Sequence, residues 1–411
     1  HSERLTMMLS LMLSVLGVLT VRADLDEYFK SVHLMQNDIK LTREQRIMLQ
    51  ERGFYVAGKW PIKDGVPTVP YYIDESIPEG ELRTNFARAA GVFHKFTCIK
   101  WVNVTKNYKG SKVHVVDNDG CGSGVGYHQN EDTVLSLAAG CEVVHIVFHE
   151  MMHAVGVQHT QCRPDRDAYV KIWPKNMIPG TEYNYAIETG STLYDIPYDY
   201  LSVMHYKSLG NTINGSYSMT ATDPYAMFVM GSHVYRWSDI AFVNKGNNCP
   251  AIFHKKCKKL DCKNAGYVGK DCSCKCPENT SGNLCENITG PFFSFVPPCS
   301  GIITKPQIIS HGYTEGSFSH ACVFKIEAPP CQKPQITILS MKLEESTPFS
   351  MIALEVSKTY FGYYFYDDTK VPYGQVFTSD GSKAAVYFYT DTKGLPQYGF
   401  NASITFTDGK C

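Results

Sequence analysis

The segment that most constrains this chain is an eleven-residue run with three histidines. It begins with His149 and Glu150, reaches His153 about one helical turn later, and ends at His159 after Gly156. Residues four positions apart lie on one face of a helix, so His149 and His153 can bind one metal ion. Gly156 can adopt a positive φ, which ends the helix and turns the chain so that His159 returns as a third ligand. Three neutral imidazoles leave positions open on zinc for water and substrate, so the run predicts a catalytic Zn²⁺ site.

The single acidic residue of this run, Glu150, has a predicted chemical role. Glu150 follows the first ligand directly and is expected to project towards a zinc-bound water, where it acts as a general base. The alternative is a helix with incidental histidines. Three histidines, one glutamate and one glycine at the required spacings argue against that alternative.

A second segment is expected below the metal. In residues 202–206, Met204 would form an apolar floor (the Met-turn) under the imidazoles, and Tyr206 could bring its phenol to the metal. These two segments, together with residues 163–167, resemble the astacin family of metzincin zinc metalloproteases. The resemblance implies that Tyr206 is a fifth zinc ligand that swings away to stabilise the tetrahedral intermediate. A packing tyrosine is the alternative for Tyr206.

The resemblance also implies a fold and an activity. It predicts an α+β, two-lobed catalytic domain over residues 53–250 and a zinc metalloendopeptidase that hydrolyses protein or peptide substrates. A secreted binding protein built on an inactive scaffold is the rival from another class. Loss of Glu150 or of one histidine would favour the rival, but all four are present.

A pro-segment is expected at residues 24–52. Residues 34–42 resemble the family's pro-segment motif, in which an aspartate binds zinc in the zymogen, and Asp38 takes that role by position. An exposed acidic residue is the alternative for Asp38. A carboxylate on zinc would displace the nucleophilic water, and cleavage after Arg52 by a trypsin-like protease would release the inhibition.

One departure from the family pattern follows the zinc ligands directly. The family usually has glutamate after the third histidine, where it anchors the new N-terminal amine, but this chain has Thr160. Threonine cannot form an ion pair, so the anchor and the mature N-terminus are left open.

The 15 cysteines indicate an oxidising compartment and further modules. Residues 257–286 resemble an EGF-like module, and residues 299–411 resemble a CUB module with a β-sandwich. Because 15 is odd, at least one cysteine lacks an intramolecular partner, and Cys162 is the candidate. Cys331 and Cys411 remain, and their pairing with each other is a further expectation. The resemblance implies these disulfides: Cys98–Cys249, Cys121–Cys141, Cys257–Cys272, Cys262–Cys274, Cys276–Cys285 and Cys299–Cys322.

Composition and the N-terminal residues bear on location. Arg4 precedes an apolar run over residues 7–21, which predicts a signal peptide at 1–23 and a secreted, extracellular protein. A net charge of -1 gives no reason to expect nucleic-acid binding, and no later stretch has the length of a membrane span. The EGF-like and CUB-like modules suggest contacts with the extracellular matrix. N-glycosylation sequons occur at Asn103, Asn214, Asn279, Asn287 and Asn401.

Overall fold

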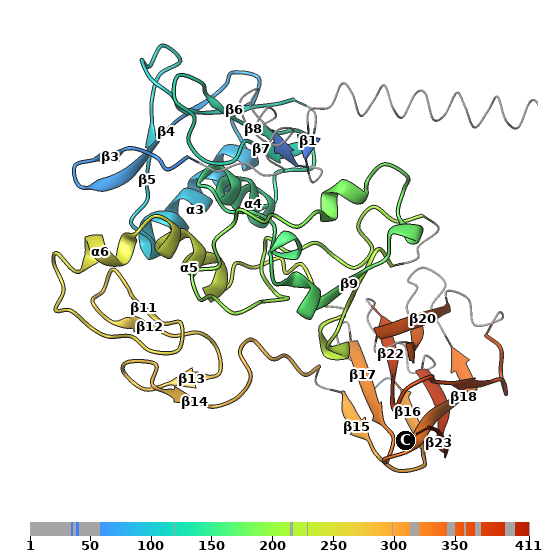
Figure 1. Ribbon diagram of the computed structural model, residues 1–411. Helices are drawn as coiled ribbons and strands as arrows, with labels where there is room; N and C mark the ends of the chain where they lie inside the picture. The colour runs from blue at the N-terminus through green and yellow to red at the C-terminus, as the bar shows by residue number, and fades with distance from the viewer. Residues whose placement is uncertain are drawn as a thin grey trace, which may run out of the picture.

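The computed structural model is shown in Figure 1. It describes residues 34–35, 38–40, 58–118, 120–213, 217–227, 229–297, 299–312, 320–342, 350–356, 359–365, 371–390 and 399–410. The predicted signal peptide and most of the predicted pro-segment lie outside these residues. Within the described part, every helix is too short or too polar to cross a membrane.

An eight-stranded mixed sheet forms the first layer of the catalytic region. Its order is β1-β2-β7-β8-β6-β4-β3, and β5 pairs with β4 off this path. Strands β4 and β5 run parallel, and the helix between them in the chain makes the crossover that a parallel pair requires. The strands are β1 (Leu34–Met35), β2 (Ile39–Lys40), β3 (Ile62–Lys63), β4 (Val66–Ile73), β5 (Lys100–Asn103), β6 (Val113–Val116), β7 (Cys121–Ser123) and β8 (Thr133–Leu137).

Two helices pack together beside this sheet. Helix α3 (Glu81–Phe96) and helix α4 (Val144–Ala154) contact each other, and α4 also contacts β7 and β8 of the sheet. Phe93 and Phe148 are buried, and their ring centroids lie 5.0 Å apart between the two helices. Burial of each ring stabilises the fold by roughly 1.5–3 kcal/mol, so this contact holds α4 against α3.

The segment after α4 is mostly irregular. Its one long element is α5 (Trp237–Gly246), which the sequence analysis did not anticipate. Asp239 stabilises the start of α5, because its carboxylate accepts the Arg236 N–H at 2.7 Å. The shorter elements are η1 (Thr160–Cys162), η2 (Arg166–Ala168), β9 (Val170–Ile172), η3 (Pro174–Asn176), η4 (Glu182–Tyr185), β10 (Met219–Ala221), η5 (Pro224–Ala226) and α6 (Cys249–Phe253).

A small disulfide-rich unit follows α6. It contains two short antiparallel hairpins and three disulfides, and it is too small to enclose a core of its own. The hairpin strands are β11 (Tyr267–Val268), β12 (Cys274–Lys275), β13 (Thr280–Ser281) and β14 (Asn287–Ile288). The disulfides are Cys257–Cys272, Cys262–Cys274 and Cys276–Cys285.

The C-terminal region is a β-sandwich, as the resemblance of residues 299–411 implies. Its sheets have the orders β15-β17-β22-β19-β20 and β16-β23-β18-β21, and one hydrophobic core with Ile326, Ile336 and Phe388 lies between them. The strands are β15 (Gly301–Ile303), β16 (Gln307–Gly312), β17 (His320–Glu327), β18 (Gln332–Lys342), β19 (Ser350–Val356), β20 (Thr359–Phe365), β21 (Val376–Thr378), β22 (Lys383–Thr390) and β23 (Gly399–Asp408).

The remaining disulfides also join the pairs that the resemblance implies: Cys98–Cys249, Cys121–Cys141 and Cys299–Cys322. Cys162 is free and buried, which confirms that it lacks a disulfide partner. Cys331 is disulfide-bonded, but Cys411, its suggested partner, lies outside the described residues.

The predicted glycosylation sites differ in their surroundings. Asn103 and Asn287 are exposed. The Asn279 side-chain amide donates to Pro291 O at 2.6 Å, and that of Asn401 donates to Ser340 Oγ at 2.8 Å. Asn214 lies outside the described residues. Asn401 is exposed as well, so Asn103, Asn287 and Asn401 all present their side chains to solvent.

The disulfide with the longest loop should contribute most to stability. Cys98–Cys249 connects residues 151 positions apart, so replacing both cysteines with serine should destabilise the catalytic region by about 2–5 kcal/mol. Thermal unfolding followed by circular dichroism measures this change. The matched control replaces Cys276 and Cys285, only 9 positions apart, and should leave the main transition in place. Equal shifts in both variants would contradict the expectation.

Candidate functional site

The end of helix α4 directs the three histidines towards one point. Helix α4 ends at Ala154, and Gly156 has a φ of 96°, a left-handed conformation that favours glycine. The Val157 N–H donates to Met152 O at 3.0 Å and closes the turn. The Trp60 indole N–H satisfies the terminal carbonyl of Ala154 at 2.7 Å. The reversal brings His159 back beside the helix.

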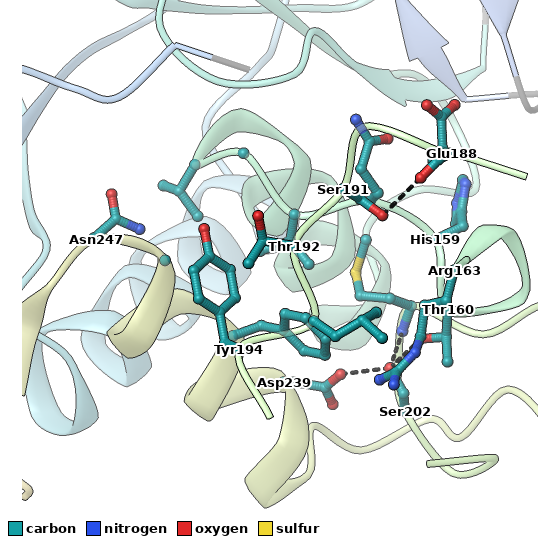
Figure 2. Close-up of a pocket in the computed structure, with 18 of the residues that line it drawn as sticks. His159, Thr160, Arg163, Glu188, Ser191, Thr192, Tyr194, Ser202, Asp239 and Asn247 are labelled. Carbon is teal, nitrogen blue, oxygen red and sulfur yellow. Dashed lines mark hydrogen bonds between the residues drawn. The ribbon is translucent and has the colours of Figure 1, made fainter. Parts of the chain in front are cut away.

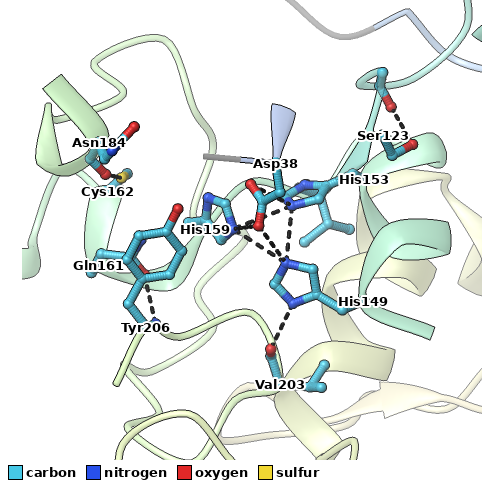
Figure 3. A network of polar contacts seen from close by, with 12 residues as sticks. Asp38, Ser123, His149, His153, His159, Gln161, Cys162, Asn184, Val203 and Tyr206 are labelled. Atoms are coloured by element: carbon cyan, nitrogen blue, oxygen red, sulfur yellow. Dashed lines mark hydrogen bonds and ion pairs between the residues drawn. The ribbon is translucent and has the colours of Figure 1, made fainter. Parts of the chain in front are cut away.

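Figure 3 shows the three imidazoles facing one another. Nε2 of His149 lies 3.2 Å from Nε2 of both His153 and His159, and the last two atoms are 3.3 Å apart. Asp38 completes the group, and the four ligand atoms all lie within 4.8 Å of one another. His153 and His159 are fully buried.

Carbonyl groups on the far side of the rings fix how two of the imidazoles are oriented. His149 Nδ1 lies 2.8 Å from Val203 O, and His153 Nδ1 lies 2.7 Å from Val157 O. A carbonyl oxygen only accepts, so each Nδ1 donates its hydrogen, and in the neutral ring Nε2 directs its lone pair at the common point. Converging lone pairs repel unless a cation lies between them, so these residues fit a zinc ion.

Asp38 reaches the histidines from the edge of the main sheet. It precedes β2, which pairs with β7, and its carbonyl accepts the Ser123 N–H at 2.7 Å. A side chain at Gly122 would clash with Asp38 O, so glycine permits this approach. Asp38 Oδ2 lies 3.1 Å from His159 Nε2 and 3.3 Å from His149 Nε2. The carboxylate therefore covers the point where a metal would bind.

Burial and charge determine how these ligand groups ionise. Burial opposes ionisation of Asp38, but the imidazoles, His159 first, lower its pKa below the usual range. Burial lowers the pKa of His153 and His159, which favours the neutral form that binds metal. Burial alone would lower the pKa of His149, but the hydrogen bond with Asp38 raises it to about 9. A proton and a metal ion therefore compete for His149 Nε2.

Glu150 lies on α4 beside the metal-binding group. It is 2 % exposed, and its Oε2 has no hydrogen-bond partner among the described residues. Burial, and then the negative charge of Asp38, raise the pKa of Glu150 well above its usual value. An unsatisfied buried carboxylate with a raised pKa has the properties of a proton acceptor.

The segment over residues 202–206 lies below the imidazoles. Met204 is buried, and its carbonyl accepts the Thr160 N–H at 2.9 Å. The Tyr206 ring packs edge-on against His159 with centroids 4.7 Å apart. Burial, and then the charge of Asp38, raise the pKa of Tyr206, so the phenol keeps its proton and can donate a hydrogen bond.

A polar network that the sequence analysis missed supports this segment. The Thr160 hydroxyl donates to Ser202 Oγ at 2.9 Å, and the Ser202 hydroxyl donates to Asp239 Oδ1 at 2.6 Å. Asp239 also accepts the Val203 N–H at 3.2 Å, and it is 1 % exposed. Figure 2 shows this network on the wall of a cavity of about 320 Å³ behind His159. Asp239 is 80 positions from His159, so only the fold reveals the connection.

Cys162 also lies near the site. Its thiol donates to Asn184 O at 3.4 Å, and burial raises its pKa well above the usual value. The thiol is therefore unreactive, which agrees with an inert packing role.

Comparison with known proteins identifies the sequence family of this region. Residues 56–246 match the family model described as Astacin (Peptidase family M12A). Protein SpAN of Strongylocentrotus purpuratus is 31% identical over 352 residues, which cover 81% of this chain and 54% of that protein. Zinc metalloproteinase nas-23 of Caenorhabditis elegans is 29% identical over 300 residues, which cover 67% of this chain and 52% of that protein. The chain spans about half the length of these curated relatives.

A solved structure is also similar in sequence. It is that of high choriolytic enzyme 1 of Oryzias latipes, a hatching enzyme zinc-protease, which is 33% identical to this chain. The matched residues cover 46% of this chain and 94% of the other, with a TM-score of 0.43.

Zinc should bind to the folded chain and stabilise it. Saturating Zn²⁺ should raise the midpoint of thermal unfolding, because a ligand at 100 times its dissociation constant stabilises by about 2.7 kcal/mol. His153→Ala should abolish the shift. His114→Ala is the matched control, because it also removes a histidine beside an aspartate, with 3.3 Å between His114 Nε2 and Asp74 Oδ2. This variant should keep the zinc-induced shift. An equal shift in the His153→Ala protein would rule out this metal site.

Proposed function

The chain belongs to the astacin family, and we propose that it is a secreted zinc-dependent metalloendopeptidase made as a zymogen. The observation that carries the proposal is the convergence of three imidazoles beside Glu150, in the segment that matches the peptidase family. Bound zinc supplies Lewis-acid chemistry, acidifying the attacking water and polarising the scissile carbonyl. Protein or peptide chains are the proposed substrates.

Glu150 is the proposed general base. Its unpaired Oε2 can accept a proton from the attacking water and later deliver that proton to the leaving amine. Because Asp38 contributes to the raised pKa of Glu150, departure of Asp38 removes one cause that favours the protonated, inactive form.

Tyr206 is the proposed stabiliser of the oxyanion. Its phenol stays protonated, and its ring packs against His159, so a small movement can direct the O–H towards the developing negative charge. Met204 is proposed to act as the Met-turn, the apolar floor that keeps the imidazoles in place.

Asp38 is the proposed zymogen ligand. Its carboxylate covers the metal-binding point and would exclude the nucleophilic water. Cleavage after Arg52 by a trypsin-like protease would release the segment that carries Asp38. Among the described residues, this segment forms strands β1 and β2, which join the rest of the sheet at β7, and the Asp38 carboxylate contacts the imidazoles. Its removal would take away β1 and β2 and leave the pairing of β7, β8, β6 and β4 in place.

The other features are proposed from the sequence pattern with structural support. The disulfide-rich unit over residues 257–286 is proposed to be EGF-like, and the sandwich over residues 299–411 to be CUB-like, with extracellular-matrix contacts. The disulfides suit an extracellular location, reached through a signal peptide at residues 1–23.

Loss of the proposed general base should abolish turnover but leave the metal. Glu150→Gln in the processed protein should lower kcat/KM by about 10²- to 10⁴-fold, the usual contribution of acid–base catalysis. Peptide cleavage and zinc content are measured together. Glu131→Gln changes an exposed glutamate and should behave as wild type. Near-normal turnover in the Glu150→Gln protein would refute the assignment.

Loss of the proposed zymogen ligand should cause activity without processing. Asp38→Ala removes the carboxylate that lies over the imidazoles, so the uncleaved, zinc-loaded chain should hydrolyse a fluorogenic peptide that the uncleaved wild type does not. Asp117→Ala, at an exposed position, is the matched control and should remain latent. Unchanged latency in the Asp38→Ala protein would count against the role of Asp38.

A further inference from the structure

Strands β17 and β22 have buried side chains on both faces of their sheet. Along β22, Ala384, Val386 and Phe388 point into the sandwich core. The alternate residues Ala385 and Tyr387 are also 0% exposed, but they belong to a different hydrophobic cluster. Because side chains on a strand alternate between faces, this second set lies on the outer face of the sandwich. A separate sandwich in solution would expose it.

The catalytic region covers this outer face. Val323, Ala385 and Tyr387 join a cluster with Tyr217, Met219 and Met227 and other residues between 170 and 230 of the catalytic region. Strand β17 contacts η5, and Figure 1 shows β17 and β22 next to the loop between β10 and α5. The sandwich is therefore packed on the catalytic region rather than tethered to it.

One lysine of the sandwich makes two specific contacts across this interface. Lys325 Nζ lies 2.6 Å from Asp223 Oδ1 and 3.6 Å from the ring centroid of Tyr225. The same Asp223 oxygen accepts the Tyr225 N–H at 3.0 Å, so Lys325 binds the carboxylate that begins η5. The Lys325 side chain is 20% exposed, which reduces its screening by solvent.

The segment that Lys325 holds also supports the residues around Tyr206. The Ser208 hydroxyl donates to Met227 O at 2.7 Å, and the Ser218 N–H donates to Ser208 O at 3.1 Å. The Tyr185 hydroxyl lies 3.0 Å from Ser218 Oγ, and the Tyr185 ring packs edge-on against Tyr206 with centroids 5.7 Å apart. Residues 217–227 thus connect the sandwich to Ser208, two residues after Tyr206, and to Tyr185, whose ring packs against Tyr206.

We propose that the C-terminal sandwich contributes to catalysis by positioning Tyr206. Lys325 is the positioning residue, and it acts on Tyr206 through Asp223 and η5. This inference rests on the proposed function and extends it. It gives the sandwich a role in transition-state stabilisation, beyond spacing or adhesion.

Charge reversal at this contact tests the proposal in the full-length, processed protein. Lys325→Glu should lower kcat by about fivefold, the lower end of typical coupling between sites, while KM changes little. Hydrogen exchange should become faster in residues 217–227 and also in residues 206–210. Asp223→Lys should act in the same way, and it also removes the acceptor of the Tyr225 N–H. The double variant should therefore recover only the part of the loss that is due to the opposite-charge pair. Lys325→Arg should retain both contacts and activity.

Lys342→Glu is the matched control, since Lys342 is an exposed lysine on β18 of the other sheet. It should change neither kcat nor hydrogen exchange. Wild-type kcat and exchange in the Lys325→Glu protein would overturn the proposal, and so would faster exchange confined to residues 217–227. If the processed wild type cleaves no peptide, the proposed function fails, and exchange at residues 206–210 alone decides whether Lys325 positions Tyr206.

Discussion

The structure depends on holding three imidazole nitrogens within 3.3 Å of one another with their lone pairs converging. This arrangement is unfavourable without a cation, so the surrounding fold has to enforce it. The carbonyls of Val157 and Val203 hold two of the rings from behind. The left-handed turn at Gly156 returns the third histidine to the helix. The supports are buried backbone groups, which keeps the metal-binding geometry nearly rigid.

The main sheet connects this geometry to its proposed control. Asp38 lies beside an edge strand, and its backbone is held by Ser123 of the neighbouring strand. The inhibitory group is thus presented by backbone pairing, while its carboxylate contacts the imidazoles. A proteolytic cut can remove such a peripheral element without disturbing the core that holds the histidines. Burial raises the pKa of Glu150 most, and the same carboxylate raises it further, so one residue affects both the metal position and the proposed base.

The sequence could predict what local spacing determines. Residues within one short run predict helix α4, its end at Gly156 and the approach of the three histidines. The family resemblance predicts the disulfides, such as Cys98–Cys249. It could not show that Asp239 supports Ser202 and Thr160, because these residues meet only after α5 packs below the site. It also placed the sandwich as a separate module. The signal for its docking was present in the unbroken apolar run over residues 384–389, which is typical of a strand buried on both faces.

Proteolysis that depends reversibly on zinc tests the central claim most directly. The full chain would be treated with trypsin, the trypsin inhibited, and casein hydrolysis followed before chelation, after chelation and after Zn²⁺ is restored. The proposed site predicts hydrolysis that appears after trypsin treatment, disappears with the chelator and returns with Zn²⁺. A correctly processed, zinc-loaded protein that cleaves no casein above the inhibited-trypsin blank would contradict the account.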